Sequence, residues 1–104
     1  MKDKNIIELD FTEFRNMLIK FRREYQTVKE MNKYLSPIDK SFSTLLDLHK
    51  AGKITPYKKI VKNRYSLWLT FDKAKVSLDE EKLIHKIAKF LLKIEAFLKE
   101  NNII

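Results

Sequence analysis

Residues 50–75 read KAGKITPYKKIVKNRYSLWLTFDKAK and hold nearly all of the excess positive charge of the 104-residue chain. They contain seven lysines and one arginine against a single acid, Asp72, which gives this stretch a net +7 out of the chain's formal +8. So much uncompensated charge on a solvated surface attracts anionic partners such as a phosphate backbone, lipid headgroups or an acidic protein. The stretch therefore indicates the sign of a partner but not its identity.

The same stretch carries the signals of a helix over residues 56–75. Thr55 followed by Pro56 is typical of an N-cap with a proline at the first helical position. Gly52 is a natural stop for the helix that precedes it. The apolar residues that follow are spaced as on one face of a helix. They are Tyr57, Ile60, Val61, Tyr65, Trp68 and Phe71.

Similar signals on either side predict three more amphipathic helices, over about residues 11–35, 37–50 and 78–100. Four such helices joined by tight turns predict an all-α fold, an antiparallel four-helix bundle that forms one domain over residues 1–104. Each of the three additional helices begins at a polar cap. The caps are Asp10 with Glu13, Ser36 with Pro37, and Ser77 with Glu80.

The composition is typical of a small intracellular domain. A hydrophobic fraction of 44% is enough for one modest core, and the absence of cysteine excludes disulfides and thiolate metal sites. No apolar run approaches the roughly 20 residues of a membrane-spanning helix, and there is no signal-peptide core. We therefore expect a soluble, cytoplasmic protein. The residues before the first helix, including Ile6 and Ile7, either pack as a short extended arm or fray.

The lysines of the predicted third helix cluster on one side of a helical wheel. Four of them fall within about a 100° sector, and Lys53 lies in the preceding turn. On such a face lysines contact phosphates without reading sequence, so that affinity depends on salt. The alternative is an ordinary solvated lysine face. The candidate anion- or partner-binding face consists of Lys53, Lys58, Lys59, Lys62 and Lys73.

Three further residues of this predicted helix are candidates for stacking or for a paired cation. The wheel places Arg64 on the apolar side near Trp68, where a cation must extend its charged end to water, stack on a ring or pair with a carboxylate. Tyr65 and Trp68 are able to stack on bases. Aromatic residues at this spacing more often belong to the core.

The sequence contains no pattern typical of a catalytic or metal site. His49 and His85 have no second histidine, cysteine or suitable carboxylate at metal-ligand spacing in their own predicted helices. The acidic run at residues 79–81 offsets the dipole at a helix N-terminus. We therefore expect a protein that is not an enzyme and has no catalytic residue, metal, cofactor or small-molecule substrate.

Residues 75–84, KVSLDEEKLI, preceded by LWLT at 67–70, resemble the junction between the third and fourth helices of immunity proteins for pediocin-like (class IIa) bacteriocins. Small size, basic charge and lack of cysteine are also similar. The resemblance, over residues 11–98, implies a four-helix bundle that protects a producer cell without enzymatic activity. Such proteins bind the bacteriocin-occupied sugar-transporter receptor at the inner membrane face. The partner would be this membrane transporter or the anionic membrane surface beside it.

The charge also fits a second function. A small basic nucleic-acid-binding protein of a plasmid, phage or replication module would use the same five lysines on phosphates. A third alternative, an assembly subunit that buries an apolar stripe against another chain, is also open because the first predicted helix has heptad-like spacing.

Overall fold

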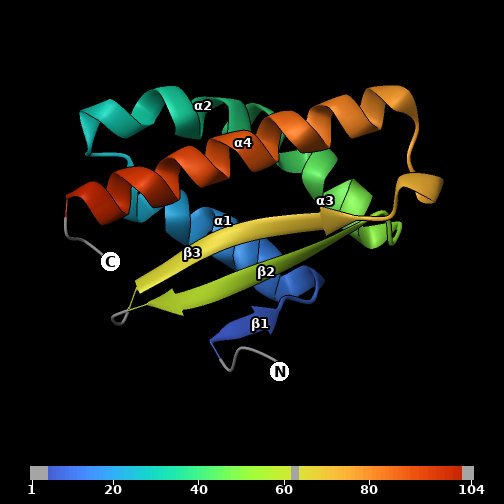
Figure 1. Cartoon of the computed structure of the whole chain (residues 1–104), viewed down its shortest axis with the longest axis horizontal. Helices are drawn as coiled ribbons and strands as arrows, with labels where there is room; N and C mark the ends of the chain where they lie inside the picture. Colours follow the sequence, from blue (N-terminus) through green and yellow to red (C-terminus); the bar gives the residue numbers. More distant parts are fainter. Residues whose placement is uncertain (1–4, 62–63, 102–104) are drawn as a thin grey trace.

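The computed structural model describes residues 5–61 and 64–101, without the side chains of Val61 and Arg64. The described residues form four α-helices, two short 3₁₀ turns and a three-stranded antiparallel sheet (Figure 1). In chain order the elements are β1 (Ile6–Glu8), α1 (Phe11–Tyr25), η1 (Lys29–Met31), α2 (Asn32–Lys40), α3 (Phe42–Lys50), β2 (Ile54–Val61), β3 (Arg64–Phe71), η2 (Lys73–Lys75) and α4 (Leu78–Glu100).

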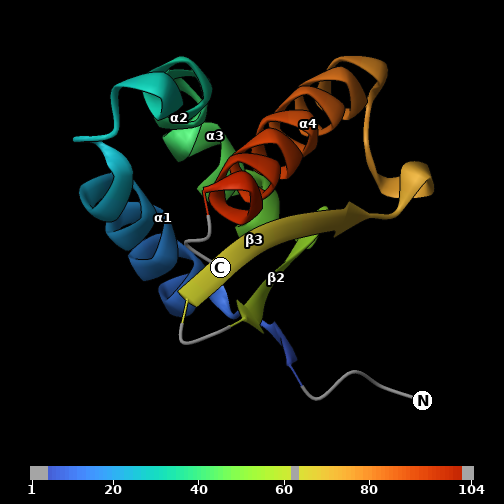
Figure 2. The same cartoon turned by 60° about the vertical axis from the view of Figure 1, so that its left-hand side comes forward.

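The molecule has two layers, a sheet and a set of helices on one side of it. The strand order is β1-β2-β3, with the central strand β2 antiparallel to both neighbours. Figure 2 shows all four helices on the same side of the sheet. Among them α4 packs against β3 and α2, and α1 packs against α3. No described helix covers the opposite side, an arrangement that antiparallel sheets commonly adopt.

One face of the sheet, which we call the inner face, supplies its part of the hydrophobic core. Its buried members include Ile54 and Leu67, each 2% exposed, and they pack with helical residues such as Phe14 and Ile94. Residues opposite one another in an antiparallel pair point to the same face, and the faces alternate along each strand. The register therefore defines the inner face as Ile7, Ile54, Pro56, Lys58, Ile60, Tyr65, Leu67, Leu69 and Phe71.

The prediction of an all-α four-helix bundle is wrong, because residues 56–75 form most of β2, all of β3 and the turn η2. This region is rich in β-branched and aromatic side chains, which favour a pleated, half-buried surface. In β3 the inward Leu67 and Leu69 alternate with the outward Ser66 and Trp68, a period of two. Reading across both strands as one segment produced a false spacing of three and four residues.

Pro56 was interpreted as the start of a helix, yet it lies within the central strand. Proline is rare there because it has no N–H to donate. The position tolerates it because β1 pairs only with Tyr57–Lys59 and so stops short of Pro56. The carbonyl of Pro56 still accepts a hydrogen bond from the N–H of Leu9, at 2.9 Å. The sheet therefore makes use of the one backbone group that the proline retains.

The helix predicted over residues 11–35 is also wrong in extent. α1 ends at Tyr25, whose carbonyl accepts a hydrogen bond from the N–H of Val28 at 3.0 Å, and Val28 itself is extended. Met31 and Leu35 nevertheless stay buried. A 3₁₀ turn advances the chain by nearly helical spacing, so the apolar pattern continues across the break and hides it.

The helix predicted over residues 37–50 is in fact two helices. Pro37 lies inside α2 instead of starting a helix, and Ser41 separates α2 from α3. Within a helix, proline forfeits only the hydrogen bond of its own missing N–H and crowds the preceding turn. α2 ends three residues after Pro37, and the break before α3 is one residue long. The two helices take different directions in Figure 1.

Two of the predicted caps are found, and two are wrong: Ser36 lies inside α2 and Thr55 lies in β2, so neither caps a helix. Both capping boxes form, at Asp10 with Glu13 and at Ser77 with Glu80, and α4 spans the expected residues. Gly52 ends α3 with a φ of 74°, in the left-handed region that favours glycine. Of the two alternatives for the N-terminal residues, the extended arm is observed, but as the strand β1 paired with β2 and not as an arm packed against helices.

Candidate functional site

The side of the sheet away from the helices, which we call the outer face, is the surface with the most distinctive chemistry. It combines aromatic, hydroxyl and charged side chains, whereas the solvated face of an antiparallel sheet is commonly polar. The register places eight described side chains there: Ile6, Glu8, Thr55, Tyr57, Lys59, Ser66, Trp68 and Thr70. Of these, Ser66 is buried, with 3% of its surface exposed.

Tyr57 and Trp68 form a cross-strand pair in the middle of the outer face. Their ring centroids lie 5.3 Å apart and their planes are inclined at 46°. Both side chains are half-buried, and neither belongs to the core or to the partly buried side chains packed against it. Two large rings outside the core, on a face without a covering helix, are therefore available to a ligand.

Lys59 provides a positive charge beside this pair. It lies two residues beyond Tyr57 in β2 and opposite Ser66 in β3, so that it shares their face. Lys59 makes no ion pair with the side chains that the structure describes. Glu8, opposite Tyr57 in β1, adds one negative charge at the far edge. The outer face is thus aromatic at its centre, basic toward one end and acidic at one edge.

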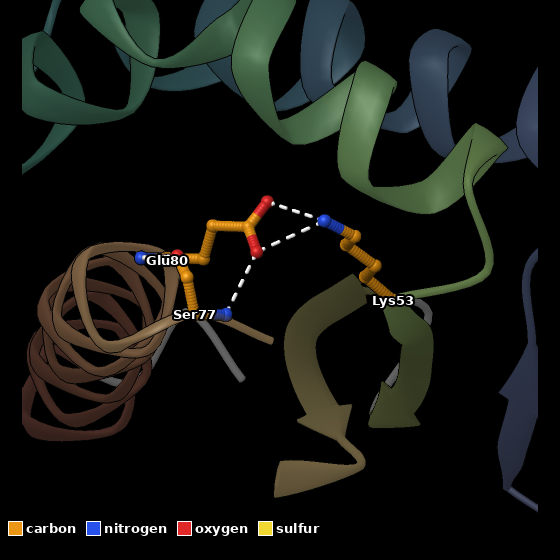
Figure 3. Close-up of polar contacts among 3 residues, drawn as sticks. All are labelled: Lys53, Ser77 and Glu80. Atoms are coloured by element: carbon orange, nitrogen blue, oxygen red, sulfur yellow. Dashed lines mark hydrogen bonds and ion pairs between the residues drawn. The ribbon is translucent and has the colours of Figure 1, made fainter. Parts of the chain in front are cut away.

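Lys53, the first of the predicted lysines, is instead part of the framework. Its ammonium donates to both carboxylate oxygens of Glu80, at 3.0 and 2.8 Å (Figure 3). The same Glu80 accepts from the backbone N–H of Ser77 at 2.9 Å, as the capping box of α4 requires. Gly52 shapes the turn that sends Lys53 toward α4, since the N–H of Lys53 bonds back to Leu48 in α3.

These contacts have an electrostatic consequence at the start of α4. The hydrogen bond from Lys53, followed by that from the backbone of Ser77, holds the pKa of Glu80 below its usual value. Hydrogen bonds that stabilise the charged form of a carboxylate lower its pKa. Lys53 therefore joins the loop before β2 to the first turn of α4 and is committed to that contact.

The other predicted lysines are dispersed. Lys58 is on the inner face, where its ammonium lies 4.9 Å from the ring centroid of Tyr65. Lys73 is in η2, with a side chain 83% exposed and 4.0 Å from Glu81. Lys62 lies outside the described residues. Among the five predicted lysines, Lys59 is the one that the described register places on the outer face.

The three candidates for stacking or for a paired cation also separate. Trp68 is on the outer face with Tyr57, whereas Tyr65 is on the inner face and packs against the core. The ring of Tyr65 is contacted by Lys58 and by Lys20 of α1, whose ammonium is 4.7 Å from its centroid. The side chain of Arg64 lies outside those described. Trp68 is therefore the stacking candidate that the fold leaves accessible.

Sequence reasoning missed a row of lysines on α4. The helix contains five lysines and five acids, so its net charge drew no attention. The acids lie near its two ends, and the segment 82–93 has none. Steps of four, three and four residues align the row on one exposed side. Its members are Lys82, Lys86, Lys89 and Lys93. Their helical spacing, in a segment that contains no acidic residue, is the signal from which the sequence could have predicted them.

His49 packs against two aromatic rings of α1. Its ring stacks on Phe11 at 6.3 Å and meets the edge of Phe14 at 5.6 Å. Burial lowers the pKa of His49, against the opposing effect of the carboxylates of Asp10 and Glu8. Its Nδ1 is buried and has no hydrogen-bond partner among the described groups. This histidine is an aromatic contact between α1 and α3.

Two hollows of the described surface lie on the helical side, away from the outer face. These hollows, of about 220 and 370 Å³, flank the ion pair between Arg22 and Asp39, whose atoms are 3.0 Å apart. Neither contains a histidine or a second carboxylate. Within residues 5–61 and 64–101, no group of three or more metal-ligating side chains is close enough to hold an ion.

Comparison with known proteins adds no further information. No family model, curated protein or solved structure matches this chain. In the described part of the chain, no helix has the length and apolar character needed to cross a bilayer.

Proposed function

We propose that this protein binds nucleic acid and that the outer face of its sheet is the binding surface. The observation that carries the proposal is the Tyr57–Trp68 ring pair, which lies outside the core on the face without helices. The formal net charge of +8 and the sequence pI near 9.7 supply the electrostatic attraction that polyanion binding needs. No catalytic step is proposed.

The two kinds of side chain on the outer face have complementary roles in such binding. Aromatic rings stack on bases, and stacking tolerates any sequence because every base has a π-face. Lysine contacts the phosphate backbone and releases counterions, which makes the affinity fall as salt rises. Lys59 stands beside Tyr57 on one strand, so base and backbone contacts are within reach of one bound segment.

The lysine row of α4 strengthens the long-range attraction. Its four ammonium groups lie on the helical layer and make no ion pair with the described side chains. Charges at this range raise the rate of encounter with a polyanion, an effect that salt screens. The row therefore contributes to association without a defined contact to the bases.

Bacteriocin immunity, with a transporter or anionic membrane as partner and a location at the inner membrane face, stays a prediction. The geometry gives it less support, because residues 67–70 lie in β3 and not at a junction between helices. Its test is expression in a bacteriocin-sensitive strain. Growth in the presence of a pediocin-like peptide would favour immunity over nucleic-acid binding.

The proposed function is tested by titrating the protein with fluorescein-labelled oligonucleotides at 50 and 200 mM salt. Trp68 is the only tryptophan, so its intrinsic fluorescence reports directly on the outer face. We expect binding that weakens as salt rises, accompanied by a change in tryptophan emission. Absence of binding at the lower salt would contradict the proposal.

A matched pair of charge reversals locates the surface. Lys59→Glu changes the outer face, and Lys40→Glu makes the same change on an exposed position of α2. Both variants lower the net charge by the same amount, so they share any loss that is due to general attraction. We expect Lys59→Glu to weaken binding more than Lys40→Glu. Equal losses of affinity would contradict the assignment of the binding surface to the outer face of the sheet.

A further inference from the structure

We infer that the ligand of the outer face is single-stranded nucleic acid, with unpaired bases stacked on Tyr57 and Trp68. The inference rests on the proposed function and specifies its substrate class. In a duplex the base faces are covered by neighbouring pairs, and only edges are open in the grooves. Flat rings on a sheet have no means of reaching base faces unless the bases are unpaired.

The layout of the fold argues against a duplex as the preferred ligand. Duplex readers commonly place a helix or a two-stranded ribbon in the major groove. Here all four helices lie on the other side of the sheet (Figure 2), and no described element projects from the outer face. A duplex resting on this face would meet Tyr57 and Trp68 only with its backbone.

The ring geometry suits successive unpaired bases. Tyr57 and Trp68 are on adjacent strands, and their inclination of 46° means that they do not stack on one another. Each ring thus keeps a π-surface for a separate base. Lys59 is two residues from Tyr57, about 7 Å along the strand, which is a suitable distance for the phosphate that joins such bases.

Tyr65 differs from Tyr57 because lysine side chains already occupy the face of its ring. The ring of Tyr65 already has the ammonium groups of Lys20 and Lys58 near it, at 4.7 and 4.9 Å from its centroid. It packs against the core on the inner face. A cation over an aromatic face uses the surface on which a base would stack. Tyr57 has no such lysine among the described cation contacts.

The test compares one 12-nucleotide strand, as DNA and as RNA, with the same strand annealed to its complement. Wild type, Trp68→Ala, Trp68→Phe and Tyr57→Ala are titrated against each by fluorescence anisotropy. We expect wild type to bind the single strand at least about tenfold tighter than the duplex. Trp68→Ala should lose about tenfold in affinity for the single strand and little for the duplex, whereas Trp68→Phe should retain most of the affinity.

The outcomes distinguish the inference from the proposed function. If neither ligand binds at low salt, the proposed function fails and the inference with it. If both bind equally and Trp68→Ala changes neither, nucleic-acid binding stands and the single-strand inference is overturned. If Trp68→Ala fails to fold, quenching of Trp68 in the wild-type chain decides. Quenching by the single strand alone supports the inference, and equal or no quenching overturns it.

Discussion

The two faces of the sheet are built from alternate residues of the same two strands, yet they have different roles. Leu67 and Trp68 are neighbours in β3, but Leu67 is 2% exposed within the core and Trp68 is half-buried outside it. The alternation of side chains across a strand separates the two roles by a single residue. Changes on the inner face should therefore act on folding, and changes on the outer face on binding.

The largest expected effect is on the inner face. Leu67→Ala should lower the free energy of unfolding by about 2–5 kcal/mol, because it leaves a cavity in the core. Thr70→Ala, on the exposed outer face of the same strand, should cost at most about 1 kcal/mol, since it removes one long hydrogen bond. Urea denaturation followed by circular dichroism measures both. Similar losses would contradict the assignment of the two faces.

A smaller loss of stability should follow from breaking the ion pair between Lys53 and Glu80, which joins the loop before β2 to α4. Lys53→Met removes the ion pair with Glu80 but leaves both hydrogen bonds of the capping box between Ser77 and Glu80. The pKa of Glu80 is lowered in the folded protein, so its contribution to stability is complete above its ordinary pKa of 4.5 and is lost as pH falls through the folded value. Acid denaturation should therefore be less steep in Lys53→Met than in wild type. Identical acid transitions would show that the ion pair contributes nothing.

His49, in the helical layer, should make the stability of the protein depend on pH. Burial lowers the pKa of His49 in the folded protein. The contribution of His49 to stability is therefore complete above its ordinary pKa of 6.5 and is lost as pH falls through its pKa in the folded protein. Denaturation midpoints between pH 8 and 5 should decline in wild type. The variant His49→Phe should lack this part of the decline, while Glu8 and Asp10 are unchanged. An equal decline in both proteins would exclude His49 as its source.

The smallest effect sharpens the comparison most, because it uses two adjacent lysines. Lys59→Gln removes a charge from the outer face, and Lys58→Gln removes one from the inner face. We expect Lys59→Gln to weaken oligonucleotide binding a few-fold and to reduce the salt slope by about one. Lys58→Gln should leave the slope closer to that of wild type. Reversal of this order would contradict the outer face as the binding surface.

Local signals were sufficient to predict the starts of α1 and α4 and the end of α3. Asp10 with Glu13 and Ser77 with Glu80 are pairs three residues apart, and each cap forms within its own segment. Gly52 ends α3 for an equally local reason, its positive φ. The charge separation within α4 could also have been predicted, because the positions of its lysines and acids are visible in the sequence.

The hairpin could not be assigned from the same kind of signal. Its spacing fitted a helix when residues 56–75 were taken as one segment, and Pro56 imitated a helix start. Whether the rings of Tyr57 and Trp68 meet depends on the register between two strands, which pairs these residues across the sheet. Period alone does not specify that partner.

The amino-acid sequence accounts for the basic charge, the absence of cysteine, the capped ends of α1 and α4, and the aromatic content of residues 54–71. Long-range packing accounts for the rest. Pairing with β1, together with burial of Ile54 and Leu67 under the helices, selects strands over a helix and places Trp68 outward. Such contacts join residues far apart in the chain, and their free energy outweighs local preferences of about 1 kcal/mol or less per residue.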